Sequence, residues 1–286
     1  MRVGFVVLLA LIAAALAGRR PSSRLQTVCR TPSDLQERFN NSCMNLGVTT
    51  SGCNEGWNAF MSAFAGKDPN NVTLSDYNDY FNVFPLMPGK DATLFWSGTF
   101  PTAEEIANDS RFNGIYSSVN LIASAIINNL EYGTCWCGDP INGGILYGTP
   151  CPSDNAVTVF WADFSVILGH NSEGIVFWLA NGERSGGTYQ PTNFFGLYEF
   201  PNLRPGVVTR LVVIDIHRKG IGEACGVGSL ISLRSKSVAK FGSNGYGCYE
   251  VEGNVQMPKT VNLTDVLNII SKEREGIQNN VTVLNT

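Results

Sequence analysis

The chain has 286 residues, of which 44% are hydrophobic and 15% are charged, so it is expected to bury a large core or two modest subdomains that share one cleft. This composition excludes a disordered chain. The formal net charge of −4 provides no basic face for a phosphate backbone, so we expect no nucleic-acid partner.

The N-terminus has the residue pattern of an export signal. One basic residue, Arg2, precedes an apolar run over residues 3–17, and small residues follow at the expected cleavage point. An uncleaved anchor is the alternative, but the run is shorter than the ~20 residues that cross a bilayer. We predict a signal peptide over residues 1–18, a single catalytic unit over 19–286 and no membrane span in the mature chain. The protein is then expected to be secreted or held in the lumen of a secretory vesicle.

Cysteines and sequons agree with export. The eight cysteines are an even number, which predicts four disulfides in an oxidising compartment. A metal site is the alternative, but Cys135 and Cys137 are the only tight pair and are one residue closer than a zinc-binding pair requires, so we expect no metal. Glycosylation is predicted at five Asn-x-Ser/Thr sites: Asn40, Asn71, Asn108, Asn262 and Asn280.

The first half of the chain is predicted to be mainly helical. Apolar residues recur at three- and four-residue spacing over 35–39, 57–64 and 77–84, which indicates helices with a buried stripe. A short strand is predicted at Thr93–Trp96, ending at the flexible Ser97-Gly98. A further helical stripe contains Val119, Ile122, Ile126 and Leu130.

The second half predicts strands buried on both faces. Apolar runs over 174–179 and 207–216 are typical of a parallel sheet covered by helices. Ser229 is expected to cap a helix that continues to Val238, and a final amphipathic helix contains Val266, Leu267 and Ile270. We therefore predict an α+β or α/β fold whose helical lobe and short parallel sheet flank a cleft. The expected ranges are 25–135 for the helical lobe, 136–250 for the α/β lobe and 251–286 for a C-terminal extension.

Common catalytic templates are missing. The two histidines, His170 and His217, accompany no Gly-x-Ser-x-Gly motif, and His217 is interpreted as structural. The glycines around Val227 lack the third glycine of a dinucleotide fingerprint, and no P-loop motif is present. A serine hydrolase, a Rossmann enzyme and a P-loop enzyme are therefore disfavoured.

One acid and two tryptophans remain as candidates for chemistry. Glu199 lies in the otherwise apolar segment 194–203, where it either has a functional role or forms a structural salt bridge or cap. Trp96 stands at a strand end, where a side chain can project into a cleft. Trp161 lies in an apolar run. Either tryptophan is a ligand platform or part of the core, and the residues alone leave both interpretations open.

Several segments together resemble the ADP-ribosyl cyclase family, which includes a soluble mollusc cyclase and membrane-anchored vertebrate NAD glycohydrolases. Residues 94–98 (Leu-Phe-Trp-Ser-Gly) resemble its first tryptophan motif, and 159–161 (Val-Phe-Trp) its second. Residues 194–199 (Phe-Phe-Gly-Leu-Tyr-Glu), followed by Pro-Asn-Leu, resemble the segment with its catalytic glutamate. The resemblance covers roughly residues 35–250, and segments 136–138, 151–152 and 225–230 match as well.

The resemblance implies an enzyme that breaks the nicotinamide–ribose bond of NAD or NADP to give ADP-ribose and/or cyclic ADP-ribose. NAD is then a substrate and no cofactor is expected; a homodimer is a possible assembly. Glu199 is expected to be catalytic, and Trp96 and Trp161 to stack on nicotinamide. Three further contacts are implied, to phosphate by Ser97, to the intermediate by Ser165 and to the base by Phe195.

The resemblance also implies how the cysteines pair. Its bridges correspond to Cys43 with Cys53, Cys137 with Cys151 and Cys225 with Cys248. Two cysteines are left over, and we predict that Cys29 bonds to Cys135.

One family motif is altered. Where the family has an acidic pair, the best match here has Val119 and Asn120. Asn120 is expected to bond the nicotinamide carboxamide, although a neutral amide does not act as a carboxylate. The alternative function is therefore a catalytically impaired nucleotide-binding or interaction protein on the same scaffold. A carbohydrate hydrolase is disfavoured because no second acid accompanies Glu199.

Overall fold

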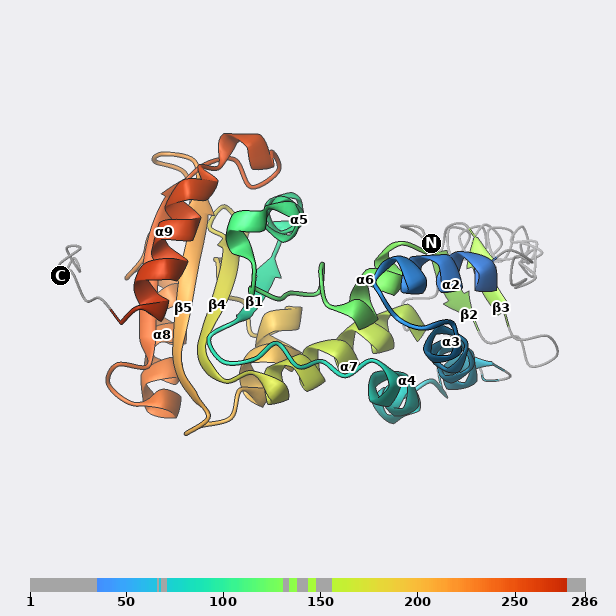
Figure 1. The fold of residues 1–286 in the computed structure, drawn as a ribbon. Helices are drawn as coiled ribbons and strands as arrows, with labels where there is room; N and C mark the ends of the chain where they lie inside the picture. The colour runs from blue at the N-terminus through green and yellow to red at the C-terminus, as the bar shows by residue number, and fades with distance from the viewer. Residues whose placement is uncertain are drawn as a thin grey trace, which may run out of the picture.

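The computed structural model describes residues 35–65, 67, 71–130 and 156–276, together with the backbone of 134–137 and 144–147. A helical half and a sheet half lie side by side (Figure 1). The helical half contains α2 (Leu35–Asn45), α3 (Thr50–Phe64), α4 (Asn78–Val83), α6 (Ile122–Asn128) and the hairpin of β2 (Thr134–Cys137) and β3 (Gly144–Tyr147). The sheet half contains β1 (Thr93–Ser97), α5 (Phe100–Asn108), β4 (Gly174–Asn181), β5 (Val208–His217), α8 (Gly228–Phe241), β6 (Tyr246–Glu252) and α9 (Leu263–Arg274). The long helix α7 (Ala156–Asn171) joins the two halves.

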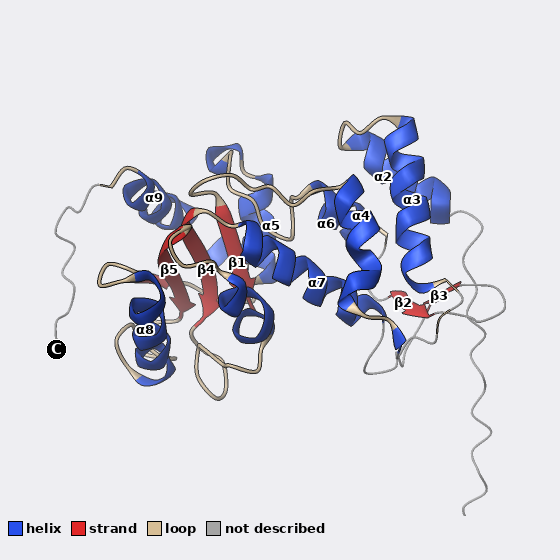
Figure 2. Cartoon of the chain, turned by 90° about the horizontal axis from the view of Figure 1, so that it is seen from below, coloured by secondary structure: helices blue, strands red, loops and turns tan. Residues whose placement is uncertain are grey.

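The central sheet is entirely parallel, in the order β1-β4-β5-β6. Its two inner strands are buried on both faces, which is why their sequences are nearly continuous apolar runs. Helices α5 and α9 cover one face, and α8 and the turn over Phe195–Glu199 cover the other (Figure 2). The predicted short parallel sheet flanked by helices is confirmed.

The helical half is built around aromatic side chains. Phe39, Tyr80 and Phe160 are fully buried, and the ring of Tyr80 meets the other two edge to face at centroid distances of 6.4 and 5.6 Å, which favour aromatic pairs. The hydroxyl of Tyr80 donates to the carbonyl of Ala123 at 2.6 Å, so its polar atom is satisfied. The same apolar cluster continues along α7 to one face of the sheet.

The chain passes between the halves more than once. Strand β1 and helix α5 come from the range expected for the helical lobe, yet β1 pairs with β4 in the sheet. Helix α7 comes from the range expected for the α/β lobe, yet Phe160 packs among the helices. The described part of the expected extension includes α9, which covers the sheet. A parallel sheet requires such crossovers because its strands run in the same direction.

Two details differ from the expectations. Ser229 does not cap α8, because the cap residue is Val227 and the Ser229 amide donates to the carboxylate of Glu223. A carboxylate there also interacts favourably with the positive end of the helix dipole. Val119 and Leu130, expected in one helical stripe, lie just outside α6.

Two disulfides are described, Cys43–Cys53 between α2 and α3 and Cys225–Cys248 between the loop before α8 and β6. They match the pairs that the resemblance implied. The predicted bonds Cys137–Cys151 and Cys29–Cys135, the signal peptide at 1–18 and the sequon at Asn280 lie outside what the structure describes.

Three of the remaining sequon asparagines, Asn71, Asn108 and Asn262, are exposed. Asn40 is half-buried, and its amide donates to Asn54 at 2.9 Å. Among the described residues, no helix has both the length and the apolar character needed to cross a membrane.

Candidate active site

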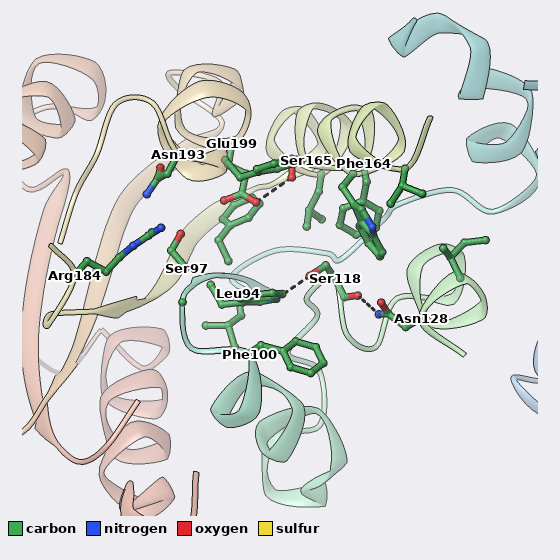
Figure 3. A pocket seen from close by; sticks show the side chains of 18 residues that line it. Leu94, Ser97, Phe100, Ser118, Asn128, Phe164, Ser165, Arg184, Asn193 and Glu199 are labelled. Carbon is green, nitrogen blue, oxygen red and sulfur yellow. Dashed lines mark hydrogen bonds between the residues drawn. The ribbon is translucent and has the colours of Figure 1, made fainter. Parts of the chain in front are cut away.

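A cavity of about 580 Å³ opens where the two halves meet. Its floor is the carboxyl end of β1, and its walls are α6, α7, the loop after β4 and the turn that ends at Glu199 (Figure 3). The carboxyl ends of parallel strands are the usual binding edge of such sheets, because the connecting loops gather there. The volume suits a ligand of nucleotide size.

Glu199 is placed by close backbone packing. It ends a π-helical turn over Phe195–Glu199, which lies against α7. A Cβ atom on Gly169 of α7 would stand 2.8 Å from the carbonyl oxygen of Glu199, so only glycine permits this approach. π-Helical turns are rare and occur frequently at functional sites.

The carboxyl group of Glu199 is buried and lines the cavity, with only 8% of the residue exposed. Its Oε1 accepts a hydrogen bond of 3.0 Å from the Ser165 hydroxyl, while Oε2 has no partner. Burial raises the pKa of Glu199 to about 8, and the bond from Ser165 opposes part of this rise. No ion pair with Glu199 occurs among the described residues, so the structural salt bridge considered above is absent there.

The tryptophans form an aromatic end of the cavity. Trp96 and Trp161 both line it and are half-buried. The indole nitrogen of Trp96 donates to the Ser118 hydroxyl at 2.8 Å, which fixes the ring plane. Asn128 of α6 lies at the same end and donates to the Ser118 carbonyl at 2.9 Å. Polar atoms therefore border an otherwise apolar site.

The opposite end of the cavity is polar. Ser97, Arg184 and Asn193 point into the space beside Glu199 (Figure 3). The Ser97 oxygen accepts from the indole nitrogen of Trp178 at 3.2 Å, so its own proton is available to a ligand. The structure thus brings together five of the predicted residues: Glu199, Trp96, Trp161, Ser97 and Ser165.

Two predicted contact residues lie elsewhere. Phe195 is fully buried and stacks on Trp178 with ring centroids 4.2 Å apart, so it belongs to the core. Its neighbour Phe194 lines the cavity and is 39% exposed. The amide of Asn120 is used by its own loop, accepting from the Ser117 amide at 2.7 Å and donating to the Ile115 carbonyl at 2.8 Å.

Sequence reasoning missed four polar residues of the cavity, Ser118, Asn128, Arg184 and Asn193, and it also missed Phe194. Asn128 had a usable signal, as a polar residue in an apolar helical stripe. Arg184 had one as well, since it follows the turn at the end of a buried strand. Across the described residues, no group of His, Cys, Asp or Glu side chains is arranged to hold a metal ion.

The fold and cavity define an α/β protein with one buried acid in a nucleotide-sized site that is aromatic at one end. Residues 34–266 match the family model for ADP-ribosyl cyclase, and the chain belongs to that family. The resemblance seen in the motifs is thereby confirmed.

Similar proteins include two sea-hare enzymes named ADP-ribosyl cyclase/cyclic ADP-ribose hydrolase. The Aplysia californica protein is 34% identical over 66% of this chain and 67% of its own length, and the Aplysia kurodai protein is 31% identical over 79% and 82%. A solved Aplysia cyclase in complex with its substrate NGD and product cGDPR has 28% identity and a TM-score of 0.67, covering 87% of this chain and 97% of that one. Porcine CD38 has 26% identity and a TM-score of 0.63, covering 78% and 97%.

Proposed function

We propose that this protein cleaves the nicotinamide–ribose bond of NAD and releases nicotinamide with ADP-ribose, cyclic ADP-ribose or both. The observation that carries this proposal is the buried carboxyl group of Glu199, which lies between an aromatic and a polar end of one cavity and has no ion partner among the described residues. The curated relatives named above support it, since they carry the cyclase and cyclic ADP-ribose hydrolase names.

The nicotinamide ring binds at the aromatic end. Its pyridinium is flat and cationic, so it gains from the indole faces of Trp96 and Trp161 by about 0.5–2 kcal/mol. Asn128 lines this end while Asn120 does not, so Asn128 takes the carboxamide contact. Its amide oxygen accepts from the carboxamide NH₂.

Bond cleavage needs no acid. The C–N electron pair leaves with the nicotinamide nitrogen, which neutralises the pyridinium and leaves positive charge on the ribose carbon. The Glu199 carboxylate stabilises that charge and bonds the ribose hydroxyls. Because the bound pyridinium is a cation, it favours the ionised carboxyl and lowers the pKa of Glu199 from its raised value in the empty cavity.

Capture of the ribosyl centre decides the product. Attack by water gives ADP-ribose, while attack by the adenine ring of the same molecule gives cyclic ADP-ribose. Phe194 offers a partly exposed ring at the cavity rim, so it takes the base contact that was expected of Phe195. NADP is proposed as a second substrate.

The decisive experiment compares wild-type protein with Glu199→Gln, which keeps the shape of the side chain but removes its charge. We expect nicotinamide release from NAD, followed by mass spectrometry, to fall by about 10²- to 10³-fold. Glu104→Gln, at an exposed position of α5, is the matched control and should retain full activity. Wild-type protein that binds NAD without releasing nicotinamide would reject the proposal and favour an impaired binding protein.

Compartment and assembly are proposed separately. We propose a secreted or vesicle-lumen protein, because the two described disulfides persist in oxidising compartments. Protein found only in the cytosol by fractionation would contradict this.

We also propose a homodimer. A monomer mass measured by light scattering would reject this proposal.

A further inference from the structure

The cavity contains one cation and one acid among its described lining residues, Arg184 and Glu199. Arg184 lies in the loop that follows β4, and its side chain points into the polar end of the cavity (Figure 3). Within the described residues, its guanidinium has no hydrogen bond or ion pair. Five N–H donors of a half-buried arginine are thus directed at the cavity.

The loop that carries Arg184 is held from the other side. Glu183, the preceding residue, points away and forms an ion pair with Arg218, so it does not neutralise Arg184. The carbonyl of Gly182 accepts from the Glu223 amide at 2.9 Å. A Cβ atom on Gly182 would stand 2.5 Å from Asp215, so the loop sits directly on that buried carboxyl. These contacts hold the loop in place, and within the described residues 182–190 only Arg184 lines the cavity.

Arg184 does not change the pKa of Glu199. The rise in the pKa of Glu199 comes from burial, opposed by Ser165, with no contribution from Arg184. The two charges instead match the order of charges along a nicotinamide dinucleotide. The pyridinium is a cation and the pyrophosphate is an anion, and the ribose that must lie at Glu199 separates them. Arg184 then lies on the side of the pyrophosphate.

We propose that Arg184 binds the pyrophosphate and makes the site select nicotinamide nucleotides over nicotinamide nucleosides. Its planar fork pairs with phosphate oxygens in two parallel hydrogen bonds, which a lysine does not reproduce. The hydroxyl of Ser97 donates from the adjacent strand end to the same group. Arg184 is a specificity-determining residue and takes no part in bond breaking. This inference rests on the proposed function.

The test measures binding in a Glu199→Gln background, where no turnover interferes. Tryptophan fluorescence gives Kd for NAD and for nicotinamide riboside, which has the same reactive half but no phosphate. Adding Arg184→Gln should weaken NAD binding by about 10- to 100-fold and change riboside binding by less than about twofold. The Kd for NAD of the Arg184→Lys protein should lie between those of the Arg184 and Arg184→Gln proteins. Higher salt should weaken NAD binding more with Arg184 present than with Gln in its place.

Arg234→Gln is the matched control, because it removes the same charge from an exposed position of α8. It should leave both Kd values unchanged. Equal loss of NAD and riboside binding in Arg184→Gln would indicate a general structural role and overturn the inference, as would unchanged NAD binding. The failure of the proposed function looks different, since wild-type protein would then release no nicotinamide from NAD.

Discussion

Ser165 is the only hydrogen-bond partner of the Glu199 carboxyl within the described structure, and its bond favours the charged form. Because kcat/KM reports the free enzyme, it should rise with pH through the pKa of Glu199, about 8. Ser165→Ala removes an effect that lowers this pKa, so the rise should move to higher pH. At pH 7 we expect kcat/KM for NAD to be about 2- to 10-fold below wild type.

The same pair of pH profiles distinguishes this role from a structural one. If Ser165 acts through the charge of Glu199, the kcat/KM values of the two proteins should converge at pH values above both pKa values, where both carboxyls are ionised. A loss of the same size at every pH would contradict this. The rise of kcat with pH should occur at lower pH than the rise of kcat/KM, because the bound pyridinium favours the ionised carboxylate of Glu199.

At the scale of the residue, sequence reasoning was limited by side-chain direction. It found Glu199 and both tryptophans through their motifs. It chose Phe195 over Phe194 because neighbouring residues in an apolar run look alike. A π-helical turn shifts the helical period, so no pattern tells which ring faces inward. It chose Asn120 by alignment to a motif, although the loop itself consumes that amide.

At the scale of the element, the contact between α7 and the Glu199 turn depends on a single glycine. Gly169→Ala would push a methyl group to 2.8 Å from the Glu199 carbonyl, so the helix and the turn must separate. We expect a loss of about 1–3 kcal/mol in the free energy of unfolding, as overpacking typically costs. Nicotinamide release should fall as well, because the displaced carboxyl no longer lies under the ribose.

Denaturant unfolding and NAD turnover on the same preparation test this expectation. His170→Ala, at an exposed position of α7 beside Gly169, provides a control on the same helix. A Gly169→Ala protein with wild-type stability and turnover would show that the contact is not needed.

The elements were largely predictable, since apolar periodicity and β-branched runs predict helices α2, α3 and α9 and strands β1, β4 and β5. The helix caps were harder to predict. Ser229 has the right chemistry for a cap, but Glu223 competes successfully because its longer carboxylate reaches the Ser229 amide. That competition depends on how the loop folds, which local sequence does not encode.

At the scale of the whole molecule, buried acids make stability depend on pH. Burial raises the pKa of Glu199 to about 8 and of Asp163 to about 7, and it also raises the pKa of Asp215, which His217 opposes. Raised values in the folded state mean that their contribution is fully present below the unfolded pKa and is lost as pH rises through the folded pKa. The free energy of unfolding should therefore decrease between about pH 4.5 and 8.

Glu199→Gln isolates one of these groups. It should be more stable than wild type at pH 9, by an amount on the order of a few kcal/mol, and show no such advantage at pH 4.5. Urea titrations at the two pH values measure the difference. An advantage of equal size at both would exclude the ionisation of Glu199 as its cause. The carboxyl would thus be retained for chemistry at a cost to stability.

Domain organisation was the least accessible to sequence, because a contiguous boundary does not describe a chain that crosses between halves. Strand β1 lies next to helical segments along the chain but next to β4 in space. Only the pairing of distant strands reveals this arrangement, because apolar patterning predicts a strand without predicting which other strand it pairs with.

The pairing of β1 with β4 also sets an order of events during synthesis. Beside it, Thr99 bonds to Leu179, 80 residues further along. Strand β1, which carries Trp96, therefore keeps an unpaired hydrogen-bonding edge until the ribosome has synthesised β4. Such distant contacts slow folding and expose unpaired edges to aggregation. A product of translation that stops before Glu199 would therefore have no active site.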